Sequence, residues 1–546
     1  MKKILFVFAL IWMALNTWAQ VTNEGHPKSW DLSKDKQQFK AYVLPEFDVQ
    51  AMLAEDEMRD KDKSGYWRFG KKFPVDLGFE DGKWLTLDNG DRIWRIKIHS
   101  PGALTMNVIF DEYELPAGAS VYLYNDDHSD LLGAYTSVQN QESKTLATWL
   151  VQGDTLWIEY YEPAGVKGQG KLHIGSVTHG YRNAQTYYDT KGFGDSGDCN
   201  HDVNCPIGDD FTAQRDHVKK SVGIIMVSGQ GFCSGALINN TANDGTPYFL
   251  TANHCVEGTT PANWVYRFGW ISPINICGEV GNSAYGPTNM TLSGSVLRAK
   301  NATSDFCLVE LNNDVPAEWD RVFAGWDRSD DLVDFVVGIH HPNGDVMKIC
   351  RDDTGPVKLT TNGTYVWMIT TGGQGWELGV TEPGSSGSPL FDPTGRIIGQ
   401  LYAGQAACNG TNDNGQYDIY GRFAVSWDTG SSNSQKLRPW LDPQGTNPES
   451  IDSYPPFYTS VTDIHEQPVE IYPNPVSDAL HIKLNATGNG YSYSLVNILG
   501  QSVTQGHLHQ GTTTIPVKDF DNGVYFLKIT GPSNQIVNVK KIVIRK

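Results

Sequence analysis

The sequence lacks the marks of several protein classes. Helical heptads and internal repeats are absent, so a coiled coil or a repeat protein is not predicted. Beyond residue 15, no apolar run approaches the roughly 20 residues that a membrane-spanning helix needs. The zinc patterns C-x-x-C and H-E-x-x-H do not occur. Acidic residues (62) outnumber basic ones (43), and this net charge of −19 argues against nucleic acid or an anionic membrane as a partner.

Cysteine is missing from most of the chain. The first 198 and the last 138 residues have none, and all eight cysteines lie between Cys199 and Cys408. An even number in an exported chain indicates disulfides, and a zinc site is the alternative. The clustering also sets this region apart from its neighbours as a domain of its own.

The N-terminus has the form of an export signal. Lys2 and Lys3 precede the apolar run from Ile4 to Leu15, and the small residues near Ala19 offer a cleavage site. Twelve apolar residues are too few to span a bilayer. We therefore expect residues 1–20 to be a signal peptide that is removed, with no anchor and no transmembrane segment.

Short alternating segments between turn residues dominate the remainder. Examples are the apolar/polar runs over 92–98 and 119–124, and the chain contains 56 glycines. Alternation of this kind is typical of strands with one solvated face. The sequence therefore predicts an all-β protein.

Three short strings have the residues that nucleophilic serine catalysis requires. They are T-A-N-H-C around His254, S-D-F-C-L-V-E-L around Asp305 and P-G-S-S-G-S-P around Ser386. A serine hydroxyl needs a base, here His254, and a buried carboxylate, here Asp305, to orient the imidazole. Taken singly, the strings also fit a core histidine, a strand-capping aspartate and a Ser/Gly turn. Their joint occurrence in this order predicts a catalytic triad.

Glycines flank the proposed nucleophile. Gly384 and Gly387 allow a sharp turn that points successive N–H groups at one spot. We expect the N–H groups of Gly384 and Ser386 to form an oxyanion hole. Cys255 directly follows His254 and is able to tie the histidine loop to Cys233.

Around these motifs the chain resembles the trypsin/chymotrypsin class of serine endopeptidases, and within it the bacterial lysyl endopeptidases. The resemblance covers residues 194–454 and implies two six-stranded β-barrels, an acyl-enzyme mechanism and no cofactor or metal. It rests on the following strings: Cys199–Pro206, Leu237–Asp244, Tyr248–Cys255, Ala324–Arg328, Ile339–Asn343, Val380–Pro389, Gly399–Leu401, Tyr420–Arg422 and Trp440–Pro443.

The resemblance also implies a pairing of the cysteines: Cys199 with Cys408, Cys205 with Cys277, and Cys233 with Cys255. Cys307 and Cys350 have no counterpart in that family. By elimination they form a fourth bridge, or they are two buried thiols. The neighbours His340 and His341 point to opposite faces of a strand, so we expect a structural role for them and not a metal site.

The resemblance places the specificity acid after the nucleophile. Trypsins have an Asp six residues before the serine, where this chain has Val380, whereas lysyl endopeptidases have one just before a Tyr-Gly-Arg string, which here is Asp418. The alternative for Asp418 is a solvated turn residue. We expect the strand Leu401, Tyr402, Ala403 and Gly404 to pair with the substrate backbone.

One feature departs from the family pattern. The family has a His stacked on a Trp beside the triad, but Tyr402 stands at the position of this His. Either Trp367 or Trp376 is available as the aromatic partner. Strict preference for Lys over Arg is therefore an open question from the sequence.

The regions on either side of the protease domain also resemble known segments. Gly82 to Ala119 resembles propeptides of this protease family, and Lys191 before Gly192 offers a site for self-cleavage. A permanent binding domain is the alternative. The tail, with strings such as Tyr472–Pro475 and Gly523–Ile529, resembles the sorting domain of the type IX secretion system of Bacteroidetes; a small binding sandwich is its alternative.

The sequence thus predicts a signal peptide (1–20), a β-rich propeptide (21–191), a serine protease domain (192–454), a linker (455–467) and a C-terminal β-sandwich sorting domain (468–546). We expect a monomer that cleaves proteins or peptides after Lys and reaches the exterior or surface of a Gram-negative bacterium through the periplasm. Its partners would be these substrates and the export machinery. The alternatives are relaxed Lys/Arg cleavage and a catalytically silent surface-binding homologue.

Overall fold

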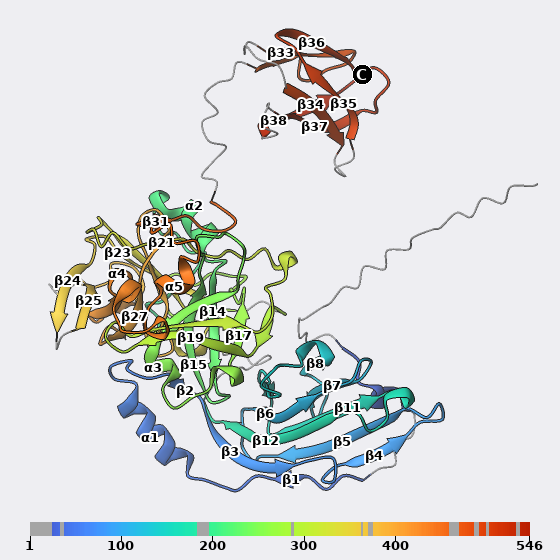
Figure 1. Cartoon of the computed structure of the whole chain (residues 1–546), viewed down its shortest axis with the longest axis vertical. Helices are drawn as coiled ribbons and strands as arrows, with labels where there is room; N and C mark the ends of the chain where they lie inside the picture. Colours follow the sequence, from blue (N-terminus) through green and yellow to red (C-terminus); the bar gives the residue numbers. More distant parts are fainter. Residues whose placement is uncertain are drawn as a thin grey trace, which may run out of the picture. The chain divides into compact units, whose positions relative to one another are not determined.

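The computed structural model describes most of the chain, and strands dominate it (Figure 1). It divides into two compact units, Met1–Phe457 and Tyr458–Lys546. The predicted signal peptide and the Lys191–Gly192 junction lie outside the described residues. The described residues are 25–32, 38–182, 196–284, 289–361, 364–369, 375–457, 469–484, 491–497, 502–530 and 536–546.

The N-terminal part of the first unit consists of two β-sheets. The first has the order β1-β5-β11-β7-β8 with β4 beside β5, and the second has the order β10-β6-β12-β3 with β9 beside β6. One apolar core joins them, with Ile158 on one sheet and Val108 on the other. The predicted runs over 92–98 and 119–124 are β5 and β7. The strands are β1 (Tyr42–Val43), β3 (Gly70–Leu77), β4 (Lys83–Thr86), β5 (Arg92–His99), β6 (Thr105–Glu114), β7 (Ser120–Asn125), β8 (Leu131–Tyr135), β9 (Leu146–Ala147), β10 (Val151–Gln152), β11 (Thr155–Glu162) and β12 (Lys171–Gly180).

The first barrel of the region that contains the cysteines has the strand order β18-β17-β14-β15-β16-β20-β19. β18 and β19 are separated by Gly294 alone, so the two ends of the sheet are halves of one strand and the sheet closes on itself. A closed barrel leaves no free edge, and its six strands match the family expectation. They are β14 (Val222–Val227), β15 (Gly231–Leu237), β16 (Tyr248–Ala252), β17 (Val265–Phe268), β18 (Thr291–Ser293) with β19 (Ser295–Asn301), and β20 (Phe306–Leu311).

The second barrel is built on a sheet of order β13-β23-β22-β26-β27-β30-β25-β24, with β21 beside β27 and β31. Together the two barrels give the all-β, chymotrypsin-like fold that the sequence predicts. The strands are β13 (His201–Asp202), β21 (Trp326–Asp327), β22 (Val336–His340), β23 (Lys348–Asp352), β24 (Val357–Thr361), β25 (Thr364–Ile369), β26 (Pro389–Phe391), β27 (Ile397–Gly404), β30 (Asp418–Arg422) and β31 (Ser450–Ile451). The hairpin β28 (Cys408–Asn409) and β29 (Asn412–Asp413) forms a separate small sheet.

Helices are short and few among the described residues. The longest, α1 (Val49–Arg59), belongs to the N-terminal region and is capped by the Asp48 side chain, which accepts a hydrogen bond from the Ala51 N–H. After α1 the chain turns into β2 (Trp67–Arg68), which adds to strand β15 of the first barrel. The other α-helices are α2 (Asp209–Val218), α3 (Asn253–Val256), α4 (Phe423–Asp428) and α5 (Arg438–Leu441).

The second unit is a small β-sandwich. One sheet has the order β32-β33-β36 and the other β35-β34-β37-β38, and side chains such as Leu480, Leu495 and Leu527 share one core. The strands are β32 (Val469–Tyr472), β33 (Ala479–Leu484), β34 (Tyr491–Asn497), β35 (Ser502–Leu508), β36 (Gly511–Pro516), β37 (Gly523–Thr530) and β38 (Ile536–Ile544).

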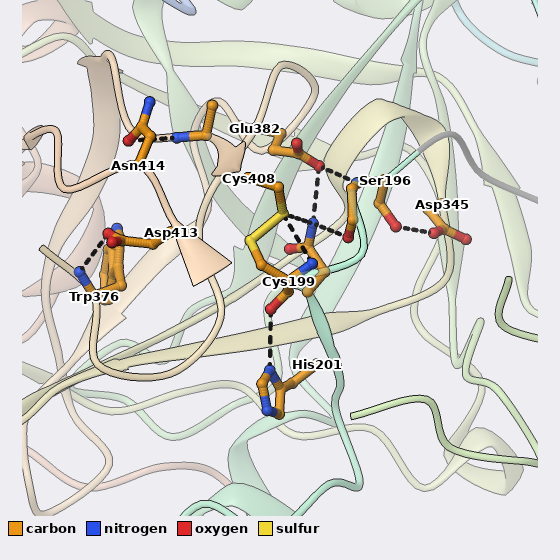
Figure 2. The surroundings of a disulfide bond; sticks show 12 residues. Ser196, Cys199, His201, Asp345, Trp376, Glu382, Cys408, Asp413 and Asn414 are labelled. Atoms are coloured by element: carbon orange, nitrogen blue, oxygen red, sulfur yellow. Dashed lines mark hydrogen bonds between the residues drawn. A yellow bond between two sulfur atoms is a disulfide. The ribbon is translucent and has the colours of Figure 1, made fainter. Parts of the chain in front are cut away.

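Three disulfides link segments of the two-barrel region, and they match the pairing implied by the resemblance: Cys199–Cys408, Cys205–Cys277 and Cys233–Cys255. Figure 2 shows the disulfide Cys199–Cys408, which joins residues 209 positions apart. Beside it, the Glu382 carboxylate accepts hydrogen bonds from the Gly197 N–H and the Asn200 side chain. Each link between distant segments reduces the freedom of the unfolded chain.

The fourth bridge expected by elimination is wrong. Cys307 and Cys350 are separate buried thiols. Cys307 belongs to β20 and the core of the first barrel, whereas Cys350 belongs to β23 and a core of the second barrel. Each behaves as a small apolar side chain of its own barrel, and burial raises the pKa of both thiols.

Candidate active site

His254 and Asp305 meet because their strands pair. β16 ends at Ala252, two residues before His254, and β20 begins at Phe306, directly after Asp305, with Ala252 opposite Phe306 in the antiparallel ladder. The His254 Nδ1 atom lies 2.7 Å from Asp305 Oδ2, and the His254 backbone N–H donates to Asp305 Oδ1 at 3.0 Å. Two hydrogen bonds therefore fix both the position and the orientation of the imidazole.

The Asp305 carboxylate is in a poorly solvated place. Its residue is 2 % exposed, and this burial raises the pKa of Asp305, while the charge and hydrogen bonds of His254 oppose the rise. The environment thus makes Asp305 dependent on a cationic or donating partner. It is suited to stabilise the imidazolium that forms when His254 takes up a proton.

The loop around Ser386 packs closely on the first barrel. Gly384 and Gly387 have φ values of 91° and 80°. A Cβ on Gly387 would lie 2.6 Å from the Ala252 backbone nitrogen, so only glycine allows this approach to the end of β16. Ser234 fastens the loop from β15: its N–H donates to the Ser386 carbonyl at 2.8 Å and its hydroxyl to the Gly384 carbonyl at 3.0 Å.

These contacts bring Ser386 to the His254 side of the site, but the serine hydroxyl is engaged elsewhere. Ser386 Oγ donates to the backbone carbonyl of Lys63 at 3.1 Å. Within the described part of the chain, His254 Nε2 is buried without a hydrogen-bond partner. The N–H groups of Gly384 and Ser386, expected as the oxyanion hole, likewise have no acceptor among the described residues.

Asp418 lies in a buried site beside this loop, and a lysine side chain fills that site. Asp418 is the first residue of β30 and is fully buried. One carboxylate oxygen, Oδ2, accepts hydrogen bonds from Trp376 Nε1 at 2.8 Å and from Thr381 Oγ1 at 2.6 Å. Gly404 borders the carboxylate so closely that a Cβ there would collide with Oδ1. The solvated-turn alternative for Asp418 therefore does not hold.

The other oxygen of Asp418 binds a lysine from the N-terminal region. Lys63 Nζ lies 2.7 Å from Asp418 Oδ1 and donates to Thr381 Oγ1 at 2.8 Å, and Lys63 is 2 % exposed. The preceding carbonyl, that of Asp62, accepts a hydrogen bond from the Gly404 N–H at 3.0 Å. Lys63 cannot be singled out from the sequence, because nothing in its local sequence distinguishes it from other lysines.

Strand β27 contains the four residues expected to bind substrate backbone, Leu401 to Gly404. Leu401 is buried, and its carbonyl accepts a hydrogen bond from the Gly387 N–H in the loop around Ser386 at 2.9 Å. The Gly404 N–H donates to the Asp62 carbonyl of the N-terminal region. Tyr402 is half-buried, and burial, with the nearby charges of Asp305 and Glu257, raises its pKa.

The structure also separates the two candidate tryptophans. Trp376 contributes to the pocket through Asp418, whereas Trp367 donates to the Ile398 carbonyl at 3.0 Å inside the second barrel.

Two histidine features bear on whether a metal could bind. His340 Nδ1 lies 2.8 Å from Ser385 Oγ, and His341 Nδ1 lies 2.9 Å from the Asp345 carbonyl, so each ring has its own partner. Cys233, His254 and Cys255 place their ligand atoms within 4.8 Å of one another. The two sulfurs there are bonded to each other, which removes them as thiolate ligands.

Comparisons with known proteins match two regions of this chain. Residues 193–421 match the family described as lysyl endopeptidase, C-terminal domain, and residues 470–545 match the secretion system C-terminal sorting domain. A lysyl endopeptidase of Pseudomonas aeruginosa is 26% identical over 352 residues, which cover 60% of this chain and 72% of that protein.

Parts of the chain are also similar to solved structures. An inactive form of a Mycobacterium tuberculosis protein is 12% identical, with a TM-score of 0.24 over 38% of this chain and 82% of that one. A serine endoprotease from Yersinia pestis is 12% identical, with a TM-score of 0.25 over 40% of this chain and 65% of that one. Among the described residues, no helix has the length and apolarity to cross a membrane.

The sorting domain marks the protein for secretion, with an extracellular or surface location. The sequence match covers the region that holds His254, Asp305, Ser386 and Asp418. Residues 193–421 are therefore similar to the C-terminal domain of lysyl endopeptidases, residues 470–545 are similar to a secretion sorting domain, and the protein is a serine endopeptidase.

Proposed function

We propose that the protein hydrolyses peptide bonds on the C-terminal side of lysine. One observation carries this proposal: a lysine ammonium is bound to the buried Asp418 carboxylate while the carbonyl of the same residue contacts Ser386 Oγ. The pocket thus accepts a lysine side chain at the depth that brings its carbonyl to the nucleophile. Val380, which is buried and apolar, offers no charge at the position used by trypsins.

In the proposed mechanism, Ser386 Oγ attacks the carbonyl carbon of the substrate lysine and His254 Nε2 takes the hydroxyl proton. Asp305 holds Nδ1 at 2.7 Å and stabilises the imidazolium. The N–H groups of Gly384 and Ser386 would receive the oxyanion, where one donor is typically worth roughly 3–4 kcal/mol. His254 then protonates the leaving amine, and water hydrolyses the acyl-enzyme by the same route in reverse.

The geometry of the pocket favours Lys over Arg. Asp418 Oδ2 is already bonded to Trp376 and Thr381, so Oδ1 is the oxygen that receives the Lys63 ammonium. An ammonium needs one such oxygen, with Thr381 Oγ1 as a second acceptor. A guanidinium gains most from two parallel bonds to both carboxylate oxygens, and this pocket offers one. Relaxed Lys/Arg cleavage is the alternative.

The experiment is a comparison of kcat/KM for matched peptide amides that end in Lys or Arg, with the mature enzyme. We expect the Lys substrate to be preferred by at least about tenfold, since loss of one charge-assisted hydrogen bond costs about 1.5–3 kcal/mol. Equal values would support the relaxed alternative. No turnover of either substrate by a folded mature protein would contradict the proposed function.

We further propose that residues 21–191 are a propeptide and that the chain passes through the periplasm of a Gram-negative bacterium, where the type IX system exports it. The sorting domain supports the route. Loss of export to the medium after deletion of residues 468–546, with accumulation in the periplasm, is the expected result. Unchanged export would contradict the route.

A further inference from the structure

The segment between α1 and β2, residues 60–66, occupies the active site of its own chain; we term it the pocket loop. Its Lys63 side chain fills the pocket and binds Asp418 Oδ1 and Thr381 Oγ1. Its backbone bonds to Gly404 on one side and to Ser386 Oγ on the other. Although the pocket loop lies more than 300 residues from these partners in sequence, its lysine binds the carboxylate proposed to select substrate lysines and its carbonyl contacts the proposed nucleophile.

The backbone of the pocket loop does not have the conformation of a substrate. Lys63 has a φ of 58°, in the left-handed region, whereas peptides that pair with a strand are extended. The Asp62 carboxylate accepts from the Ser64 N–H at 3.1 Å and from its hydroxyl at 2.7 Å, which fixes a tight turn around Lys63. The Lys63 carbonyl accepts from the Ser386 hydroxyl and does not accept from the N–H groups of Gly384 and Ser386.

This arrangement is not suited to acylation. The hydroxyl proton that His254 must remove is directed at the Lys63 carbonyl, and His254 Nε2 has no hydrogen-bond partner within the described residues. The oxygen that would become the oxyanion lies outside the expected hole. The pocket loop therefore binds through a lysine side chain, as a substrate would, but its carbonyl is not placed for attack by the serine.

Both ends of the pocket loop are fixed. On the N-terminal side, the Asp60 carboxylate at the end of α1 accepts from Arg182 at 2.7 Å, and Asp56 binds Arg68 at 2.6 Å. On the C-terminal side, β2 pairs with β15, with Trp67 opposite Phe232. These anchors hold Lys63 at the pocket without further ordering of the chain.

The N-terminal sandwich also contacts the protease region beyond the pocket loop. Asn107 donates to the Gly229 carbonyl at 3.1 Å, and Gln141 donates to the Ser293 carbonyl at 2.8 Å. A ligand held in this way has an effective concentration on the order of millimolar or higher. An external substrate at micromolar concentration competes poorly against it.

We propose that Lys63 is a built-in inhibitor: it occupies the lysine pocket through Asp418 and keeps the full-length chain closed to substrates until the N-terminal region is removed. This inference rests on the proposed function, because Lys63 competes with substrates only if the pocket selects lysine. It attributes the proposed inhibition of the full-length protein to one side chain, and it explains why a lysine is buried to 2 % exposure.

The test uses the full chain carrying Ser386→Ala, which prevents self-cleavage and keeps the Lys63–Asp418 pair. The probe is Nα-dansyl-lysine amide, which fills the pocket with one side chain, and its binding is measured by fluorescence. We expect Lys63→Ala to strengthen binding by about 100-fold, since it removes a tethered competitor. Lys61→Ala is the matched control, because Lys61 is an exposed lysine on the same loop and its loss should change nothing.

Two further proteins separate the possible failures. Lys63→Gln keeps the length of the side chain without its charge and should also open the pocket; near-identical thermal melting shows that both variants fold. The mature Ser386→Ala protein, which lacks residues 21–191, should bind the probe as tightly as Lys63→Ala. If the mature protein binds and both Lys63 variants bind no better than Lys61→Ala, the inhibitor role is refuted. If the mature protein does not bind, the lysine pocket itself is refuted.

Discussion

Asp418→Asn in the mature enzyme should abolish cleavage after lysine while leaving the catalytic serine intact. Asp418 is fully buried, and its Oδ1 atom lies 2.7 Å from a lysine ammonium in the structure. Asparagine has nearly the same shape and its carbonyl oxygen is able to accept the bonds from Trp376 and Thr381. The change thus removes the counter-charge of the pocket and little else.

The magnitude follows from the burial of the pair. Removal of one partner from a buried ion pair costs roughly 3–5 kcal/mol, which corresponds to a loss of about a hundred- to several-thousand-fold in kcat/KM for lysine substrates. A small ester without a cationic side chain does not use Asp418, so its hydrolysis should fall by less than about tenfold. The triad contacts, such as His254 to Asp305, are untouched.

The assay compares kcat/KM for a lysine peptide amide and for such an ester, with fluorophosphonate labelling as the measure of an active serine. Asp413→Asn is a matched control, because its carboxylate also borders Trp376, accepting its backbone N–H at 3.2 Å, but does not contact Lys63. Equal losses on amide and ester would show that Asp418 supports the barrel in general. Full lysine activity would refute the role of Asp418 in specificity.

Three other predictions concern processing, thiols and acid stability. Ser386→Ala protein should retain residues 21–191, whereas active enzyme should acquire an N-terminus near Gly192, and N-terminal sequencing decides between them; an active enzyme that starts far upstream would refute the propeptide role. Non-reduced, denatured protein should titrate two thiols, Cys307 and Cys350, whereas none would restore the fourth bridge. The free energy of unfolding should fall between about pH 6.5 and pH 4, because burial lowers the pKa of His341 to about 4, so the unfolded state binds a proton that the folded state does not. For His341 alone this amounts to about 3 kcal/mol, and His341→Gln should flatten the denaturation profile in this range; an unchanged profile would refute the buried neutral ring.

The sequence singles out the three residues proposed as the triad because each has a local setting that suits its chemistry. His254 and Asp305 flank paired strands, and the turn at Ser386 requires glycines at positive φ. The two-barrel fold and the role of Asp418 were predicted only from the resemblance to a family. A single Asp before a Tyr-Gly-Arg string does not by itself indicate a specificity residue. The structure adds the reason for its location, which is the polar cage of Trp376 and Thr381.

The contacts of Lys63 could not be predicted. They join positions more than 300 residues apart, and the charge pattern around Lys63 is that of an ordinary helix end. Counting cysteines failed for a related reason. An even number of cysteines allows every one to be paired, but it does not show where each one lies. Cys307 and Cys350 lie in the cores of different barrels.

The most direct test of the account is a map of the bonds that the mature enzyme cleaves in a denatured protein, read by mass spectrometry of the peptides. The account predicts new C-termini at lysine, and none with the Ser386→Ala enzyme. Cleavage at residues unrelated to lysine, or the same peptides from the Ser386→Ala enzyme, would contradict a serine endopeptidase whose pocket is built on Asp418.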